Sequence, residues 1–248
     1  MRLLILGGTS EASALAAALA ARADIEATLS LAGRTQRPAS SPVPMRIGGF
    51  GGVEGLRAYL GAEDVDAVVD ATHPFAAQMS HHAAQVCEAA RIPLLVFTRP
   101  RWERRSGDRW IEVQTMEEAA RALGAIPRHV FLTQGRLQLG AFANAPQHRY
   151  IVRAIERPEG IEALPNHRLI LSRGPFRLID EEALMREENI EIVVSKNSGG
   201  DATYAKIGAA RNLGLPVVMV RRPTKPSAAQ TTNLDQVLAW IDSHRAAP

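Results

Sequence analysis

The chain has 248 residues, of which 46% are hydrophobic and 22% charged, a composition that excludes disordered and collagen-like proteins. The single cysteine, Cys87, excludes an internal disulfide and any metal site built from several cysteines. A net charge of +3 does not favour a nucleic-acid partner, and no apolar stretch reaches the ~20 residues that a membrane span needs. The first apolar residues lead directly into Gly7-Gly8, which is untypical of a secretory signal peptide, so we expect a cytoplasmic protein without nucleic-acid or membrane partners.

Basic residues are strongly biased toward arginine. Of the 29 basic residues only Lys196, Lys206 and Lys225 are lysines. The codon composition of a GC-rich genome would explain most of this bias. Guanidinium groups also bind carboxylates and phosphates with two parallel hydrogen bonds, so an anionic ligand would fit the same composition.

In the first half of the chain, short apolar runs typical of strands alternate with helical patterns. The predicted strands are residues 3–6, 27–31, 45–47, 67–70 and 94–98, and the predicted helices are 10–22, 53–60 and 75–90. The charged segment 99–109 has neither periodicity and is the predicted linker.

The alternation continues in the second half. The predicted strands there are residues 110–113, 129–133, 150–153, 169–172, 190–195 and 217–220, and the predicted helices are 116–123, 137–143, 180–188, 203–213 and 234–244. Continuous Val, Ile and Leu runs are typical of strands that are buried on both faces. The sequence therefore predicts an α/β fold with parallel sheets covered by helices.

Two segments of the chain resemble each other. Residues 89–100 and 209–223 both run from a helix end through a strand to an Arg-Pro pair, and Pro100 and Pro223 are 123 positions apart. The preceding strands, 68–71 and 193–196, correspond with an offset of 125. Any βαβ unit could produce such a likeness. Two Rossmann-like domains, residues 1–105 and 106–248, would nevertheless fit the length.

The first strand leads through Gly7-Gly8-Thr9-Ser10-Glu11 into the first helix. Glycines let the backbone approach a pyrophosphate, and the start of a helix offers N–H groups and a positive dipole. The G-x-G-x-x-G pattern is incomplete, because Thr9 and Ala12 occupy its second and third glycine positions. A turn capped by Thr9 or Ser10 would explain the same residues, but the position at the start of an α/β chain favours a dinucleotide site.

The residues after the second and third strands favour NADPH over NADH. An NAD site usually has an acidic residue after the second strand, whereas residues 28–39 contain none and offer Ser30, Gly33 and Arg34, with Arg37 as a further cation. Gly49, Phe50 and Gly51 follow the third strand in a glycine-rich turn, which indicates close approach of the backbone to another group. Solvated loops are the alternative interpretation of both segments.

The fourth strand ends in Asp70-Ala71 and continues into Thr72-His73-Pro74. Ligands of doubly wound sheets bind beyond the carboxyl ends of the strands, so Thr72, His73 and Pro74 are predicted to face the cofactor. His73 could orient the nicotinamide, contact the substrate or donate a proton. A histidine that caps the next helix would be the structural alternative.

Similar polar loops follow strands in the second half and would form a second site attractive to a polyanion. The most distinctive is Lys196-Asn197-Ser198-Gly199-Gly200, which leads to Thr203 and Tyr204 at the next helix. The others are Gln134-Gly135-Arg136 and Arg173-Gly174.

Taken in this order, the motifs resemble the precorrin-6A reductase family of cobalamin biosynthesis, over essentially the whole chain. The segments that carry the resemblance are residues 7–11, 70–76, 133–135, 172–176, 196–200 and 203–206. The resemblance implies an NADPH-dependent reduction of one double bond of the precorrin-6A macrocycle to give precorrin-6B. It also implies two Rossmann-like domains with the active site in the cleft between them.

On this interpretation the nicotinamide supplies a hydride, and His73, Lys196 or Tyr204 supplies the proton. NADPH would contact Gly7, Gly8, Thr9, Ser10, Glu11, Ser30, Gly33, Arg34, Gly49, Phe50, Gly51, Thr72, His73 and Pro74. The carboxylates of the tetrapyrrole-derived substrate would contact Gln134, Gly135, Arg136, Arg173, Gly174, Lys196, Asn197, Ser198, Gly199, Gly200 and Thr203. No metal is required, and a monomer or a small homo-oligomer is expected.

Two other functions compete with this interpretation. A non-catalytic NADP-binding regulator would need only the first glycine loop, so the polar loops of the second half argue against it. A short-chain dehydrogenase, as another NADP-dependent reductase, would need Tyr-x-x-x-Lys, and no lysine stands four residues after Tyr59, Tyr150 or Tyr204.

Overall fold

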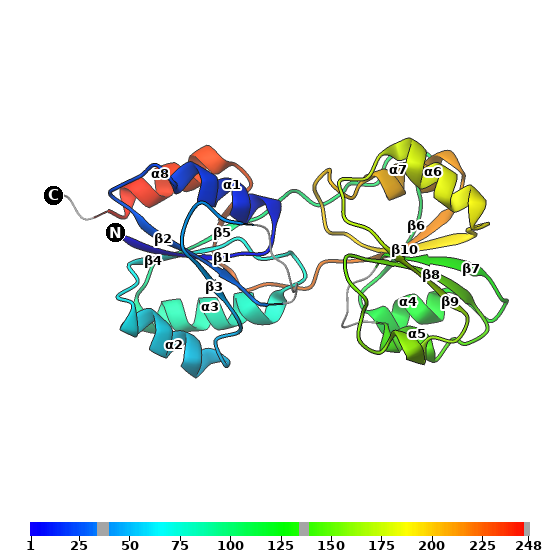
Figure 1. Cartoon of the computed structure of the whole chain (residues 1–248), viewed down its shortest axis with the longest axis horizontal. Helices are drawn as coiled ribbons and strands as arrows, with labels where there is room; N and C mark the ends of the chain where they lie inside the picture. The colour runs from blue at the N-terminus through cyan, green and yellow to red at the C-terminus, as the bar shows by residue number, and fades with distance from the viewer. Residues whose placement is uncertain (34–39, 134–138, 246–248) are drawn as a thin grey trace. The chain divides into compact units, whose positions relative to one another are not determined.

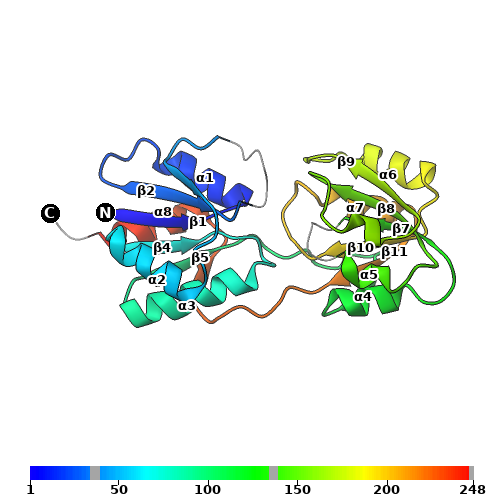
Figure 2. The ribbon, with the colours of Figure 1, turned by 60° about the horizontal axis from the view of Figure 1, so that its bottom comes forward.

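The computed structural model describes residues 1–33, 40–133 and 139–245. The chain divides into two compact units: unit 1 comprises Met1–Pro100 and Pro223–Pro248, and unit 2 comprises Arg101–Arg222. Within the described residues each unit contains one six-stranded parallel sheet, with helices packed on both of its faces (Figures 1 and 2). The chain therefore crosses from unit 1 to unit 2 and returns.

In unit 1 the first strand lies near the centre of the sheet, with later strands on both sides of it. The strand order is β3 (Met45–Ile47), β2 (Glu26–Leu31), β1 (Arg2–Leu6), β4 (Ala67–Asp70), β5 (Leu94–Phe97) and β12 (Ala229–Thr231). One face is covered by α1 (Ser10–Leu19) and α8 (Leu234–Ser243), and the other by α2 (Val53–Ala62) and α3 (Ala77–Ala90) (Figure 1). Successive side chains of β1 point to opposite faces, so Leu3 and Ile5 enter the core with α1 and α8, and Leu4 and Leu6 the core with α2 and α3.

Unit 2 has the same arrangement. Its strand order is β9 (His167–Leu171), β8 (Arg149–Ala154), β7 (His129–Leu132), β10 (Ile192–Lys196), β11 (Pro216–Val220) and β6 (Arg109–Val113). The helices are α6 (Leu178–Glu187) and α7 (Ala205–Asn212) on one face and α4 (Met116–Ala122) and α5 (Gly140–Ala143) on the other (Figure 1). A 3₁₀ turn, η2 (Ile161–Ala163), follows β8. The aromatic residues Phe131 and Tyr150 are fully buried at the centre of this unit.

The internal likeness in the sequence corresponds to equivalent places in the two sheets. β4 and β10 each lie fourth in the order, and β5 and β11 each lie fifth. Asp70 pairs with Val96 in unit 1, and Ser195 pairs with Met219 in unit 2, which reproduces the offsets of 125 and 123. The unit 1 sheet has the strand order 3-2-1-4-5-6 of the Rossmann fold, and the unit 2 sheet has the same arrangement except that its sixth position is taken by β6, which precedes the other strands of the unit. The α/β prediction is confirmed.

The predicted division at residues 105 and 106 differs from the observed one at the C-terminus. Residues 223–248 belong to unit 1, because β12 pairs in parallel with β5 and Val237 and Ile241 of α8 enter the core with β1. Each sheet thus takes its sixth strand from a segment next to a crossover, β6 before β7 and β12 after β11. The first crossover, at Pro100–Arg101, does lie in the predicted linker.

In the part of the chain that the structure describes, no helix combines the length and the apolar character needed to cross a membrane.

Candidate functional site

The turn between β1 and α1 is shaped for close approach of a ligand to the backbone. The Gly7 amide donates to Ser30 O at 2.8 Å, and a Cβ at Gly7 would lie 2.5 Å from Leu29 Cδ1, so a larger residue there would have to displace the Leu29 side chain. Gly8 has a φ of +113° and open space around it. The turn therefore presents bare backbone at the N-terminus of α1, as a pyrophosphate site requires.

Thr9 connects this turn to the end of β4. Its hydroxyl accepts from Ala12 N at 3.2 Å as the N-cap of α1 and donates to Ala71 O at 2.7 Å. Glu11, in the first helical turn, pairs with Arg99 at the end of β5. Of the two candidate caps, Thr9 is the N-cap of α1, and its hydroxyl is hydrogen-bonded to backbone groups of the protein. Ser10 is exposed at the start of the helix.

The end of β4 carries a buried carboxylate. Asp70 is 1% exposed, and its Oδ1 accepts from Thr72 N at 3.0 Å and from Thr72 Oγ1 at 2.6 Å. Its Oδ2 accepts from the Ser80 hydroxyl of α3 and lies 3.8 Å from Lys225 Nζ. Asp70 therefore fixes Thr72 beside the glycine turn of β1.

His73 follows Thr72 in the same loop and is half-buried, while Pro74 is buried. Phe75 N donates to His73 Nδ1 at 3.2 Å, so a neutral imidazole would carry its proton on Nε2. The structure thus brings the residues 7–11 and 72–74 together at one edge of the unit 1 sheet, as the sequence predicted.

The ends of β2 and β3 contain a cation that sequence reasoning missed. Arg46 pairs opposite Ser30, and its Nη1 donates to Ser30 Oγ at 2.9 Å and to Gly48 O at 3.0 Å. Its guanidinium lies 3.9 Å from the centroid of the Phe50 ring. The absence of an acid at this place was the available signal, but only strand pairing shows which arginine meets Ser30.

Of the other predicted site residues, the glycines after β2 and β3 lie at the same edge of the unit 1 sheet, and five more fall outside the described residues. Gly33 and Gly51 have positive φ values of 72° and 83°, while Gly49 is exposed and its carbonyl accepts from Arg46. Arg34, Arg37, Gln134, Gly135 and Arg136 fall outside the described residues.

In unit 2 the loop after β10 is held by both crossover segments. The Asn197 side chain accepts from Trp102 N at 2.8 Å and donates to Trp102 O at 2.9 Å, and the Trp102 indole donates to Gly200 O at 2.7 Å. Arg222 donates to Asn197 O and Ser198 O at 3.0 and 3.1 Å. These hydrogen bonds fix the conformation of the loop, and the Asn197 side-chain amide is used in fixing it.

The predicted substrate motifs of unit 2 meet at the start of α7. A Cβ at Gly174 would lie 3.0 Å from Ala202 O, and Phe176 N donates to Ala202 O, so the loop after β9 packs against the residue that precedes Thr203. Arg173 is exposed, and Lys196 and Thr203 are half-buried. The residues 173–174 and 196–203 thus lie at one edge of the unit 2 sheet.

Tyr204 and Lys206 lie beneath this loop. The Tyr204 hydroxyl accepts from Arg211 Nη2 at 2.6 Å, and its ring lies 5.7 Å from that of Trp102. Lys206 is 5% exposed, donates to Thr203 O at 2.8 Å and lies 5.0 Å from the Trp102 ring. Burial and the nearby Arg153 lower the pKa of Lys206 to about 7.

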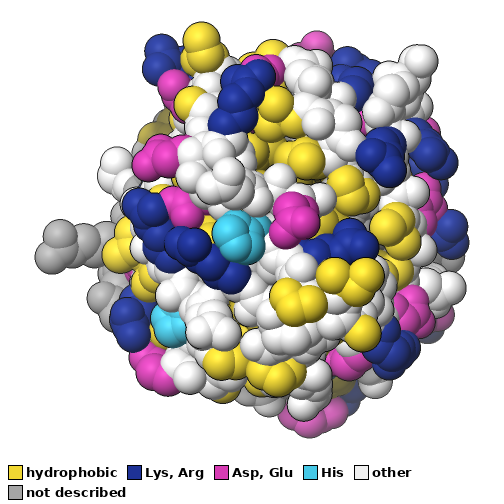
Figure 3. All heavy atoms as spheres, turned by 90° about the vertical axis from the view of Figure 1, so that its right-hand side faces the viewer, with side chains coloured by type: hydrophobic (Ala, Val, Ile, Leu, Met, Phe, Trp, Pro, Cys, Tyr) yellow, Lys and Arg dark blue, Asp and Glu magenta, His cyan; other side chains and the backbone are white. Residues whose placement is uncertain are grey.

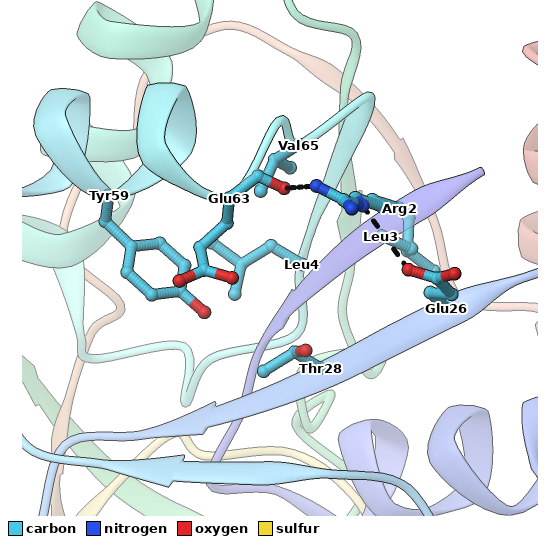
Figure 4. A pocket seen from close by; sticks show the side chains of 8 residues that line it. All are labelled: Arg2, Leu3, Leu4, Glu26, Thr28, Tyr59, Glu63 and Val65. Atoms are coloured by element: carbon cyan, nitrogen blue, oxygen red, sulfur yellow. Dashed lines mark hydrogen bonds and ion pairs between the residues drawn. The ribbon is translucent and has the colours of Figure 1, made fainter.

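Two cavities of the described structure lie away from these loops. One of about 160 Å³ opens at the amino ends of β1 and β2, where Arg2 lies between Glu26 and the Glu63 carbonyl (Figure 4). It is on the opposite sheet edge from the glycine turn. Another, of about 510 Å³, lies between α4 and α5.

The face drawn in Figure 3 carries interspersed acidic and basic side chains rather than one basic surface. Within the described residues no group of three or more His, Cys, Asp or Glu side chains is placed to hold a metal ion.

Comparison with known proteins gives matches over the whole chain. A model of the family "Precorrin-6x reductase CbiJ/CobK" matches residues 2–242. Precorrin-6A reductase of Rhodobacter capsulatus is 47% identical and aligns over 100% of this chain and 98% of its own, and that of Mycobacterium tuberculosis is 47% identical over 97% of both.

A more distant relative and a solved structure point to the same family. Cobalt-precorrin-6A reductase of Priestia megaterium is 30% identical over 89% of this chain and 90% of its own. The solved structure of CobK precorrin-6A reductase superposes with a TM-score of 0.93 and 47% identity over 100% of this chain and 98% of that one. The motifs, the paired Rossmann-like sheets and these matches together show that the chain belongs to the precorrin-6x reductase family.

Proposed function

We propose that this chain is an NADPH-dependent reductase that reduces one double bond of precorrin-6A to give precorrin-6B, in cobalamin biosynthesis. The observation that carries the proposal is the 47% identity to precorrin-6A reductases over the full length, together with a solved CobK structure of the same fold. Relatives named for the cobalt-containing substrate are 30% identical or less, which favours the cobalt-free macrocycle. We also propose a cytoplasmic enzyme, monomeric or a small homo-oligomer.

The edge of unit 1 fits a nicotinamide dinucleotide. Gly7 and Gly8 leave the backbone bare at the start of α1, where a pyrophosphate would accept from backbone N–H groups. NADPH, when bound, supplies the hydride. Thr72, His73 and Pro74 at the end of β4 would line the nicotinamide half, and the residues after β2 and β3 the adenosine half.

Preference for NADPH would come from cations near Ser30. Arg34 follows β2 in the sequence, and Arg46 is hydrogen-bonded to Ser30. A guanidinium favours a 2′-phosphate, and the acid that would bind a free 2′-hydroxyl is missing from residues 28–39.

The edge of unit 2 fits the macrocycle carboxylates. Lys196, Arg173 and the glycine-rich loop held by Trp102 and Arg222 form a rigid polar surface to which anionic side chains would bind. His73, Lys196 and Tyr204 stay the candidate proton donors. The Tyr204 hydroxyl accepts a hydrogen bond from Arg211, which fixes its position.

Anaerobic oxidation of NADPH, with and without precorrin-6A, tests the reaction. Oxidation that depends on precorrin-6A, with precorrin-6B as product, would support the proposal, and cobalt-precorrin-6A as a competing substrate tests the choice of macrocycle. NADPH binding without turnover would favour a non-catalytic regulator.

Dissociation constants of NADPH and NADH test the cofactor assignment. Arg34→Ala should weaken NADPH binding by roughly ten- to a hundredfold and leave NADH nearly unchanged, because one charge-assisted hydrogen bond is lost. Arg46→Ala should act on the same ratio, although loss of its bonds to Gly48 and Gly49 will weaken both cofactors to some degree. Equal losses for both cofactors in both variants would place the 2′-phosphate elsewhere, with Arg37 next to be tested.

Lys196→Ala tests the division between the units. We expect turnover to fall by roughly tenfold or more, while the dissociation constant of NADPH stays nearly unchanged. Loss of NADPH binding with retention of macrocycle binding would assign the loop after β10 to the cofactor instead.

A further inference from the structure

Lys225 lies at the cofactor edge of unit 1, although it follows the whole of unit 2 in the sequence. Its Nζ is 3.5 Å from Thr72 Oγ1 and 3.8 Å from Asp70 Oδ2, and its side chain is 19% exposed. The lysine is therefore held at the end of β4 and still reaches the surface. Neither its spacing nor its surroundings in the sequence indicate this position.

The Asp70 carboxylate explains why a cation is kept there. Asp70 accepts from Thr72 and Ser80 and is 1% exposed, and a buried carboxylate is strongly destabilised unless hydrogen bonds and a cation compensate its lost hydration. Lys225 supplies that cation from the returning segment. Asp70 in turn restricts the ammonium group to the neighbourhood of Thr72.

The place of β4 in the sheet defines what would lie next to this ammonium group. In a 3-2-1-4-5-6 sheet the dinucleotide crosses the point between strands 1 and 4, with one nucleotide over each half. Ser30 and Arg46 lie at the ends of β2 and β3, on the adenosine half. Thr72 and Lys225 lie at the end of β4, on the half that takes the other nucleotide.

We propose that Lys225 is a cofactor-binding residue that hydrogen-bonds the hydroxyl groups of the nicotinamide ribose. This inference rests on the proposed function, since it assumes a nicotinamide dinucleotide at this edge. An ammonium group can only donate hydrogen bonds, and ribose hydroxyl groups can accept them. A ribose placed next to Thr72 would therefore lie within reach of the Lys225 ammonium group. The nicotinamide half of the site is then completed only after the chain has passed through unit 2.

Binding of two ligands to the full-length protein tests this inference without turnover. NADPH contains the nicotinamide riboside, whereas adenosine 2′,5′-bisphosphate lacks it. Lys225→Met should weaken NADPH binding by roughly ten- to a hundredfold and change the affinity for adenosine 2′,5′-bisphosphate less than about twofold. Lys225→Arg should recover part of the NADPH affinity, because the charge and donors return.

Two further variants separate ligand contact from folding. Arg221→Gln, four residues before Lys225 and in an exposed pair with Glu112, should leave both affinities unchanged. Asp70→Asn combined with Lys225→Met removes both charges, so it avoids an unpaired buried carboxylate and should still lose NADPH affinity selectively. Thermal unfolding without ligand shows whether each variant is folded.

The outcomes are distinguishable. Equal weakening of both ligands, or unchanged NADPH affinity in Lys225→Met and in the double variant, would overturn the role of Lys225. Failure of the unmodified protein to bind NADPH would instead overturn the proposed function.

Discussion

The first five positions of the two sheets share one strand order, and their fourth and fifth strands share one register, but the units place different chemistry at equivalent positions. Asp70 and Ser195 occupy the same position in the fourth strand of each sheet, and both are 1% exposed. The Asp70 carboxylate is stabilised by Thr72, Ser80 and Lys225, whereas the Ser195 hydroxyl donates to Lys196 O. The shared fold fixes where a polar group lies, and the side chain decides what it can bind.

The interiors of the units differ as well. Arg153 and Glu181 are buried in unit 2 and form a bidentate ion pair. Lys206 is buried close to this pair. Arg153 also lies 3.6 Å from the centroid of the Phe176 ring, so this group supports the loop after β9. In unit 1 the buried polar side chains among the described residues are Ser30, Asp70, Thr72 and Ser80. Unit 2 should therefore respond more strongly to loss of a charge.

The largest effect is expected for Glu181→Gln. Arg153 would become an unpaired buried guanidinium, which typically costs about 3–5 kcal/mol of unfolding free energy. Urea unfolding in a Trp240→Phe background reports on unit 2, because the remaining tryptophans, Trp102 and Trp110, both belong to it. The neighbouring Asp180→Asn is the matched control and should have little effect, since its pair with Arg177 is exposed. Similar losses in the two variants would contradict the distinction.

A smaller effect is expected for Asp70→Asn in unit 1. The amide NH₂ would face Lys225 or Ser80 in place of an acceptor, and a hydrogen bond to a charged group contributes about 1.5–3 kcal/mol. Hydrogen exchange of the β4 amides should accelerate accordingly. Ser195→Ala removes one hydrogen bond between neutral groups and should affect the β10 amides less. A larger effect at β10 would reverse the comparison.

The pH dependence of stability should differ between the units because of Lys206. Its pKa is lowered to about 7 in the folded protein from the ordinary value of 10.5. Between these values the unfolded chain binds more protons, so the stability of unit 2 rises with pH from about 7 toward 10 and is lost as pH falls. We expect on the order of 1–2 kcal/mol between pH 7 and 9.

Lys206→Met should flatten this dependence while keeping the volume of the side chain. The measurement is urea unfolding of unit 2 at several pH values in the Trp240→Phe background. An unchanged pH profile in Lys206→Met would show that other groups cause it.

The smallest effect is expected at the helix starts. α1 has the Thr9 cap, whereas no side chain caps α7 at Tyr204. Thr9→Ala should cost about 1 kcal/mol, and Thr9→Ser should retain most of the stability. Exchange of the first-turn amides of α1 in cofactor-free protein measures this. Equal protection in Thr9→Ala and the unmodified chain would show that the bond to Ala12 contributes nothing.

The sequence by itself determined most of the helices and strands and most of the positions where loops leave the sheets. Buried parallel strands need mostly apolar residues, so the strand 67–70 was located at its observed bounds. The glycine turn after β1 and the Thr9 cap were recognisable because their chemistry is local. The offset between residues 100 and 223 was consistent with two equivalent sheets, although any βαβ unit could have produced it.

Only the tertiary structure decided how distant segments meet. β12 is three residues long and largely exposed, and it is held by backbone pairing with β5, so no hydrophobic pattern marks it and the C-terminal segment was placed in the second domain. Arg46 meets Ser30 through strand register, and Lys225 meets Thr72 across 153 positions of chain. Such contacts depend on the order of the strands in a sheet. That order is set by packing between segments that are distant in the sequence, so the local pattern of one segment does not predict it.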